Sequence, residues 1–188
     1  YMVMELLEGE SLAHRLDEGE PLTVHQALRL LASCLRGLVA VHAAGVVHVD
    51  LKPDNLFLTR DGDGEPVPKL VDFGISRSLV HKPGVTFVTK TGMILGSPQY
   101  MSPEKARGAK GVDVRADLYS AGVVLYEVLT RRLPFEAENV ADLLMRLWSA
   151  PPVPIETRRP ELAGDLAAFV ARAIAREPAD RFQSAVAM

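Results

Sequence analysis

The apolar pattern between Thr23 and Gly45 constrains the fold more than any other feature of this sequence. Thr23 and Gln26 have the spacing of a capping box at the start of a helix, and Gly45 supplies a stop signal at its end. The residues that share one face at helical spacing between them are Val24, Ala27, Leu28, Leu31, Cys34, Leu35, Leu38 and His42. The spacing therefore predicts a long helix with one face packed against a core.

Short β-like runs replace the helical spacing after Gly45. The apolar runs lie at 46–47, 56–58 and 69–71, and the turn Asp61-Gly62-Asp63-Gly64 predicts a hairpin between the last two. That turn resembles a calcium loop only superficially, because the expected flanks are strands and not helices.

Helical patterns dominate the rest of the chain. They cover 11–17 and, approximately, 115–130, 139–148 and 165–176. The prolines of 151–160 predict a loop, as does the aperiodic segment 78–96, and residues 1–7 predict a strand. The sequence therefore predicts an α+β fold, mainly helical, with short β-hairpins.

Composition narrows the classes of function. A net charge of -3, from 21 basic and 24 acidic residues, gives no indication of nucleic-acid or membrane-surface binding. Cys34, the only cysteine, excludes an internal disulfide and suits a reducing compartment, so we expect a cytoplasmic location. The best apolar run, 121–129, contains Glu127 and falls short of the roughly 18–20 residues that span a bilayer. We therefore expect no membrane contact within this segment.

Three short motifs follow one another in a fixed order. They are His48-Val49-Asp50-Leu51-Lys52-Pro53-Asp54-Asn55, Asp72-Phe73-Gly74 and Ser102-Pro103-Glu104. Together they resemble the catalytic loop, the metal-binding turn and the end of the activation segment of protein kinases. Lys52-Pro53 and residues 96–104 resemble the serine/threonine kinases of bacteria, and the resemblance extends over the whole chain.

The resemblance implies a protein-kinase-like fold in a partial kinase domain. Residues 1–10 would be the last small-lobe strand and the hinge, and residues 11–188 the large lobe, truncated at its C-terminal end. No glycine-rich phosphate loop and no small-lobe lysine with its partner glutamate occur in the sequence. We therefore expect the small lobe, which is missing from this sequence, to be a partner of the chain. We expect this chain alone to bind ATP weakly and to be inactive.

The resemblance also implies a set of catalytic residues. Asp50 would accept or orient the proton of a substrate hydroxyl, and Lys52 would contact the transferred phosphate. Asn55 and Asp72 offer the oxygen ligands that Mg²⁺ prefers beside phosphate oxygens. Capping of a helix or turn would explain Asp50 or Asp72 alone, but not both in this order.

Nucleotide binding by this likeness would involve the start of the chain. The backbone of Glu5 and Leu7 would bind the adenine of ATP, Phe57 would lie beneath the ring, and Met4 would be the gatekeeper. Ordinary core packing would explain these positions equally well.

Other positions of the likeness concern scaffold and regulation. Asp117 would hold the catalytic loop, and Arg181 would pair with Glu104. Thr89 and Thr91 resemble autophosphorylated threonines.

One position departs from the pattern, because Val49 replaces the arginine that grips a phosphorylated loop. Arg77 is a partial substitute, so we expect activity to depend less on loop phosphorylation.

The sequence leaves three classes of function open. The first is an ATP- and Mg²⁺-dependent kinase of serine or threonine in protein substrates. The second is a pseudokinase or nucleotide-binding scaffold. The change to Val49 favours this class, whereas it is disfavoured by the presence of Asp50, Lys52, Asn55 and Asp72. The third is a kinase of small molecules. Members of that class generally lack the peptide-docking segment that residues 96–104 (the docking segment) resemble.

Overall fold

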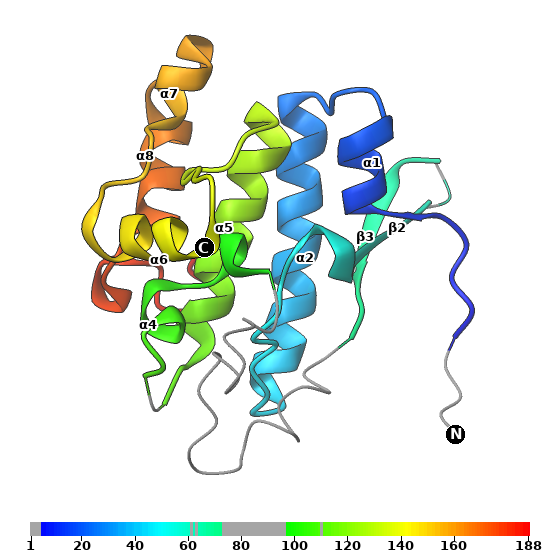
Figure 1. Cartoon of the computed structure of the whole chain (residues 1–188). Coiled ribbons are helices and arrows are strands. Elements are labelled where there is room, and N and C mark those ends of the chain that lie inside the picture. Colours follow the sequence, from blue (N-terminus) through cyan, green and yellow to red (C-terminus); the bar gives the residue numbers. More distant parts are fainter. Residues whose placement is uncertain (1–4, 61, 63, 73–96, 110) are drawn as a thin grey trace.

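The computed structural model describes residues 5–60, 62, 64–72, 97–109 and 111–188, and this part of the chain is mainly helical (Figure 1). Its strands are β1 (Glu10–Ser11), β2 (Leu56–Arg60) and β3 (Pro66–Leu70). Its α-helices are α1 (Leu12–Glu18), α2 (Val24–Ala43), α4 (Pro103–Ala106), α5 (Val114–Thr130), α6 (Val140–Ser149), α7 (Ile155–Arg158) and α8 (Asp165–Ala173). Short 3-10 turns include Pro53–Asn55 and Pro98–Tyr100. The predicted α+β class, with helices dominant, is confirmed.

Helix α2 begins where the sequence predicts. The Thr23 hydroxyl accepts from the Gln26 backbone N–H at 3.2 Å, and the Gln26 side chain accepts from the Thr23 N–H at 3.0 Å. The buried face differs from the prediction at two positions, because Leu30, which was not predicted, is buried, while Leu28, which was predicted, is 39% exposed. The two residues lie about 200° apart on a helix of 3.6 residues per turn, so the prediction included one residue too many and missed another.

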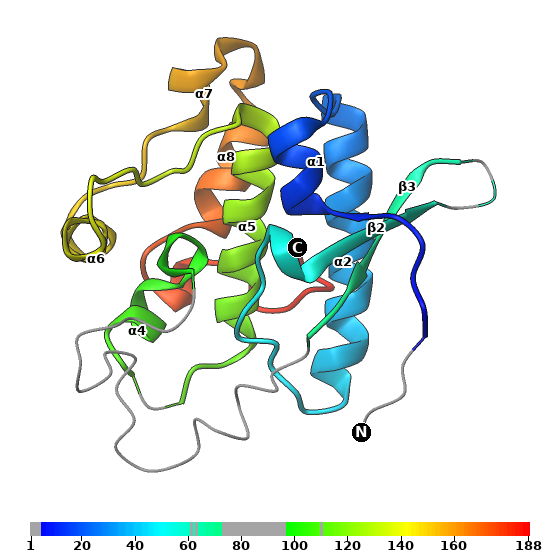
Figure 2. The same cartoon turned by 45° about the vertical axis from the view of Figure 1, so that its right-hand side comes forward.

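Helix α2 is also long and apolar enough to cross a membrane by length and composition alone. The sequence pattern instead indicates 121–129 as the best apolar run. Its buried stripe packs against α5 and β3, as expected for a core helix. Figures 1 and 2 show α2 and α5 running side by side, with the β2–β3 hairpin against α2 and α8 against α5. The two central helices thus contact both the hairpin and α8.

The three strands form one antiparallel sheet in the order β1-β2-β3. The predicted hairpin is confirmed, with Phe57 opposite Lys69. The pairing of β1 with β2 was not predicted, and Gly9 precedes it at φ 144°, where a Cβ would lie 1.9 Å from the Leu58 carbonyl oxygen. Only glycine therefore fits at this entry to the sheet.

Two predicted strands are wrong in the described residues. Residues 46–47 follow α2 without joining a sheet, and Glu5 to Leu7 likewise form no strand. Residues 1–4 lie outside the described part. A strand requires a paired neighbour, which local sequence does not reveal.

The helices after the catalytic motifs are confirmed within a few residues at either end. One prediction was wrong in part, because the proline-rich segment 151–160 contains α7 at Ile155–Arg158. Pro154 is its N-cap residue, and a one-turn helix is too short to produce a periodic signal.

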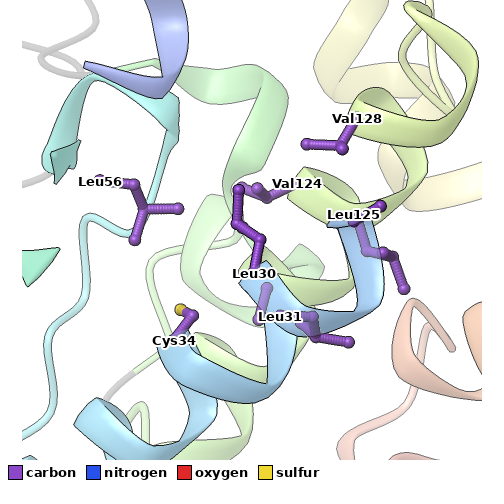
Figure 3. A pocket seen from close by; sticks show the side chains of 9 residues that line it. Leu30, Leu31, Cys34, Leu56, Val124, Leu125 and Val128 are labelled. Atoms are coloured by element: carbon purple, nitrogen blue, oxygen red, sulfur yellow. The ribbon is translucent and has the colours of Figure 1, made fainter. Parts of the chain in front are cut away.

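The core between α2, β2 and α5 contains a cavity of about 10 Å³ (Figure 3). Its lining is apolar and includes Leu30, Cys34, Leu56 and Val124. Burial raises the pKa of the Cys34 thiol to about 12, so this cysteine is an inert core residue, as predicted. The cavity is far below the roughly 300 Å³ of a ligand pocket and is a packing gap.

Candidate active site

The loop that follows α2 is fixed to α5 by one buried carboxylate. Asp117 is 1% exposed, and its two oxygens accept the backbone N–H groups of His48 and Val49, each at 2.8 Å. His42 on α2 reaches the same carboxylate at 2.9 Å. Asp117 therefore joins the end of α2, the loop and α5, the scaffold role that the family resemblance implied.

The loop places three of the predicted residues side by side. The Asn55 amide Nδ2 donates to the Asp50 carbonyl oxygen at 2.8 Å and to Asp50 Oδ2 at 3.2 Å. Lys52 Nζ lies 3.7 Å from the same Oδ2. The Asp50 side chain is 34% exposed, so the carboxylate is oriented by two neighbours while remaining open to solvent.

Asn55 connects this group to the end of β3. Its own carbonyl oxygen accepts the Val71 N–H at 3.0 Å, and His48 Nε2 lies 3.2 Å from the Val71 carbonyl oxygen. Asp72 is the next residue along the chain. It is exposed and has a left-handed backbone, with φ 58°. Two separate contacts thus hold the backbone that carries Asp72 against the loop that carries Asp50.

The predicted metal ligands are compatible with Mg²⁺ bound beside phosphate. Both hydrogen bonds of the Asn55 amide group use Nδ2, so Oδ1 is the atom left to bind a cation. Asp72 supplies an exposed carboxylate. No cluster of three or more His, Cys, Asp or Glu occurs among the described residues. An amide oxygen and a carboxylate form a sparse donor set, which suits Mg²⁺ because it usually completes its shell with waters and substrate phosphates.

The predicted docking segment lies against the catalytic loop. Lys52 Nζ donates to Ser97 Oγ at 3.3 Å. Ser120 Oγ on α5 donates to the Tyr100 carbonyl oxygen at 2.8 Å, and the Tyr100 hydroxyl donates to Glu127 at 2.8 Å. Burial raises the pKa of Glu127, and the nearby Glu127 charge adds to burial in raising that of Tyr100. The described end of this segment is therefore anchored on α5.

The predicted pair of Glu104 and Arg181 is confirmed as a bidentate ion pair. Arg181 is fully buried, and its two terminal nitrogens donate to the two Glu104 oxygens at 2.8 and 2.7 Å. Burial alone would raise the pKa of Glu104, but the hydrogen bonds and charge of Arg181 outweigh it and hold the pKa below its usual value. This pair closes the docking segment onto the C-terminal part of the chain.

The predicted adenine-contacting residues lie at the β-sheet. Lys69 Nζ contacts Glu5 Oε1 at 2.6 Å, and Lys69 is the cross-strand partner of the half-buried Phe57. Leu7 is partly exposed between Glu5 and β1. These contacts bring Glu5 and Phe57 to one neighbourhood; their part in nucleotide binding stays a prediction.

Several predicted residues lie outside the described part of the chain, namely Met4, Phe73, Gly74, Arg77, Thr89 and Thr91. Conversely, the sequence interpretation missed Lys105, which is buried and donates through Nζ to the Val49 carbonyl oxygen. Its position directly after Ser102-Pro103-Glu104 was the available signal, but a lysine in that place is ordinarily a surface residue.

The match to the protein kinase domain model covers residues 1–188, so the chain belongs to the protein kinase domain family. It is 41% identical over 188 residues to the serine/threonine-protein kinase Pkn1 of Myxococcus xanthus and 38% identical over 188 residues to PknL of Mycobacterium tuberculosis. It covers 26% and 45% of those two proteins, respectively. The predicted resemblance to bacterial serine/threonine protein kinases is therefore confirmed.

The fold is similar to that of a solved kinase domain. A crystal structure of a double mutant of the Mycobacterium tuberculosis PknI kinase domain superposes with a TM-score of 0.69 at 26% sequence identity. The superposition covers 97% of this chain and 60% of the PknI chain. The protein-kinase fold, mostly helical with a small antiparallel sheet, is confirmed.

Proposed function

We propose that the natural protein containing this chain transfers the γ-phosphoryl group of ATP to serine and threonine hydroxyls of protein substrates. The observation that carries the proposal is the arrangement of Asp50, Lys52 and Asn55, with a carboxylate oriented by an amide donor and flanked by an ammonium. Phosphoryl transfer needs positioning and neutralised charge more than covalent chemistry, and these three groups supply both.

Asp50 acts on the substrate hydroxyl. Asn55 fixes one of its carboxylate oxygens, and the partial exposure of the side chain leaves the group accessible to a substrate. A carboxylate so oriented accepts the hydroxyl proton while the oxygen attacks the phosphorus. Its position directly after two N–H groups held by Asp117 keeps it in place.

Lys52 and the metal-binding oxygens act on the phosphates. Lys52 lies between Asp50 and Ser97, so its ammonium is set between the catalytic loop and the docking segment, where a transferred phosphoryl group passes to substrate. A bound Mg²⁺ would supply positive charge that neutralises the phosphates. Asn55 Oδ1 and the Asp72 carboxylate would hold the ion.

Protein substrates are favoured over small molecules by the segment that ends at Glu104. Its described part, from Ser97 onward, is held by hydrogen bonds to α5 and to Arg181 and lies beside Lys52, where a peptide could bind. We further propose that Thr89 and Thr91 are autophosphorylated, and that activity depends on this less than in kinases with an arginine at the position of Val49.

The test is phosphate transfer by the natural full-length protein, with ATP, Mg²⁺ and a general protein substrate. Asp50→Asn keeps the shape of the side chain but removes the base, and we expect it to lower kcat by about 10²–10⁴-fold. Asp54→Asn is the matched control, because Asp54 is exposed on the adjacent turn, and we expect activity within about twofold of wild type.

Three results separate the alternatives. Transfer that is absent from the wild type while nucleotide still binds would support the scaffold function instead. Transfer that persists in Asp50→Asn would refute Asp50 as the base. Transfer to a small-molecule panel but not to proteins would support the third class. The isolated 188-residue chain is expected to transfer little phosphate, because it contains no glycine-rich phosphate loop.

A further inference from the structure

Lys105 is a buried lysine that the proposed chemistry does not use. It lies on α4, directly after Glu104, and is 7% exposed. Its Nζ donates to the carbonyl oxygen of Val49, the residue that immediately precedes Asp50. Lysine is rarely buried to this degree because its charge loses hydration, so the position calls for a compensating role.

The residue that Lys105 contacts has a strained backbone. Val49 has φ 70°, in the left-handed region, which is unusual for a β-branched side chain. Such conformations cost about 1–3 kcal/mol and persist only where surrounding contacts enforce them. Here the Val49 N–H donates to Asp117 and the Val49 carbonyl oxygen accepts from Lys105. Charged side chains from α5 and α4 therefore hold the two polar groups of Val49 from opposite ends of the residue.

The charges around Lys105 are consistent with a role in holding the loop at Val49. Burial lowers the pKa of Lys105, while the carboxylates of Asp50 and Asp117 favour its charged form and Lys52 opposes it. The ammonium thus lies within the field of Asp50 and of the loop anchor. Removing it would leave those two carboxylates with less positive charge around them.

A second lysine makes the reverse contact. Lys52 on the catalytic loop donates to Ser97 at the start of the described docking segment, while Lys105 at the end of that segment donates to the catalytic loop. The loop and the segment are therefore tied at two points by lysines that reach in opposite directions. The contact of Lys52 with Ser97 includes a residue of the proposed chemistry, and the contact of Lys105 with Val49 reaches the backbone beside Asp50.

We propose that Lys105 is a positioning residue that clamps Val49 and thereby sets Asp50 relative to the docked substrate, a constitutive tie at a place where the sequence lacks a loop-gripping arginine. The proposal rests on the proposed kinase function and extends it to regulation: the active geometry of the catalytic loop is supplied by a lysine of the chain itself. A phosphate on the preceding loop is then not required to order Val49.

The test compares Lys105→Met with Lys105→Arg and with Arg107→Met in the natural full-length protein. Met keeps the length of the lysine stem without its donor, and Arg keeps charge and donor. Arg107→Met removes an exposed cation from the adjacent C-cap position of the same helix. Hydrogen exchange of the peptide containing residues 46–52 is measured beside steady-state kinetics, and Lys105→Gln is measured in parallel as a polar, uncharged replacement.

We expect Lys105→Met to lower kcat for protein substrate by about 10- to 100-fold, because small misplacements of reacting groups cost that much. KM for ATP should stay within about twofold, and exchange of residues 46–52 should rise at least about threefold, since local opening follows lost contacts. Lys105→Arg should recover most of the kcat, Lys105→Gln should fall between Met and wild type, and Arg107→Met should match wild type in every readout.

Two results would overturn the clamp. One is Lys105→Met with kcat and exchange both at wild-type values. The other is a kcat loss that Lys105→Arg does not repair, accompanied by faster exchange throughout the domain, because that pattern indicates a merely structural residue. The exchange measurement needs no catalysis. A wild-type protein that transfers no phosphate would therefore refute the kinase function, while the same variants would still decide whether Lys105 holds Val49.

Discussion

Arg181→Met should destabilise this domain more than any change of an exposed ion pair. Arg181 is fully buried, and besides its two bonds to Glu104 it donates to the carbonyl oxygens of Ala175, Arg176 and Arg115. Its guanidinium also lies 4.8 Å from the centre of the Tyr119 ring. Methionine refills most of the volume but leaves the Glu104 carboxylate, whose side chain is 19% exposed, without its counter-charge.

The magnitude follows from that lost partner. Breaking one side of a buried pair costs about 3–5 kcal/mol, because the remaining charge stays desolvated. For a domain of this size, about 4 kcal/mol corresponds to a Tm lowered by roughly 8–16 °C. Adding Glu104→Gln to Arg181→Met removes the orphaned charge, so the double variant should regain part of the loss, with a coupling of about 1–3 kcal/mol.

Urea denaturation of the four proteins of this double-mutant cycle, followed by circular dichroism, measures these free energies. Arg132→Met is the matched control, because Arg132 and Glu136 form an exposed pair at 3.5 Å, for which about 0.5 kcal/mol or less is expected. An Arg181→Met variant within about 1 kcal/mol of wild type would refute the reasoning. So would a double variant whose losses are simply additive, because then the two side chains do not act as a pair.

Three further outcomes are expected. Asp117→Asn should cost about 1–3 kcal/mol in chemical denaturation and also lower kcat, because its NH2 group replaces one carboxylate oxygen and cannot accept the His48 or Val49 N–H that faced it; unchanged values for both would contradict the anchor. Gly9→Ala should lower Tm by several degrees, because φ is 144° and the new Cβ would meet the Leu58 carbonyl, whereas the open turn residue Gly62→Ala should stay within about 0.5 kcal/mol of wild type. The hydrogen bonds and charge of Arg181 outweigh burial and hold the pKa of Glu104 below the usual value of a glutamate, so its contribution to stability is present above that usual value and is lost as the pH falls through the folded pKa. Arg181→Met should flatten this acid-side loss in pH-dependent denaturation, and an unchanged slope in that acid range would count against the pair as its source.

Local signals predicted most of the fold. The capping box of α2, the Gly-containing turn between β2 and β3 and the apolar spacing of α5 all act within a few residues of the chain. Predictions failed where structure depends on a distant partner. The stretch Glu5 to Leu7 has strand-like composition but no paired strand, while Glu10 and Ser11 form β1 because β2 lies beside them.

The residues of the candidate site were also predicted where a local motif marks them and missed where a distant contact does. The family motifs identify Asp50, Lys52, Asn55 and Asp72, and the structure places Asn55 and Lys52 each beside the Asp50 carboxylate. Lys105 was missed, because its contact joins α4 to a residue 56 positions earlier in the chain, and periodicity carries no such information. A residue outside the motifs, such as Lys105, therefore becomes visible only once its distant contact is known.

The N-terminal turns of α5 are where these holding groups converge. Asp117 binds the catalytic loop, Ser120 binds the docking segment at Tyr100, and Arg115 and Tyr119 contact Arg181, the partner of Glu104. The two segments that the proposed function brings together around a substrate are thus fixed to about two turns of one helix. Because residues 116–120 of these turns are buried, the spacing between Asp50 and the docking segment is set by the fold itself. This arrangement explains why Lys52 and Lys105 need only short contacts to tie the two segments together: α5 has already placed them side by side.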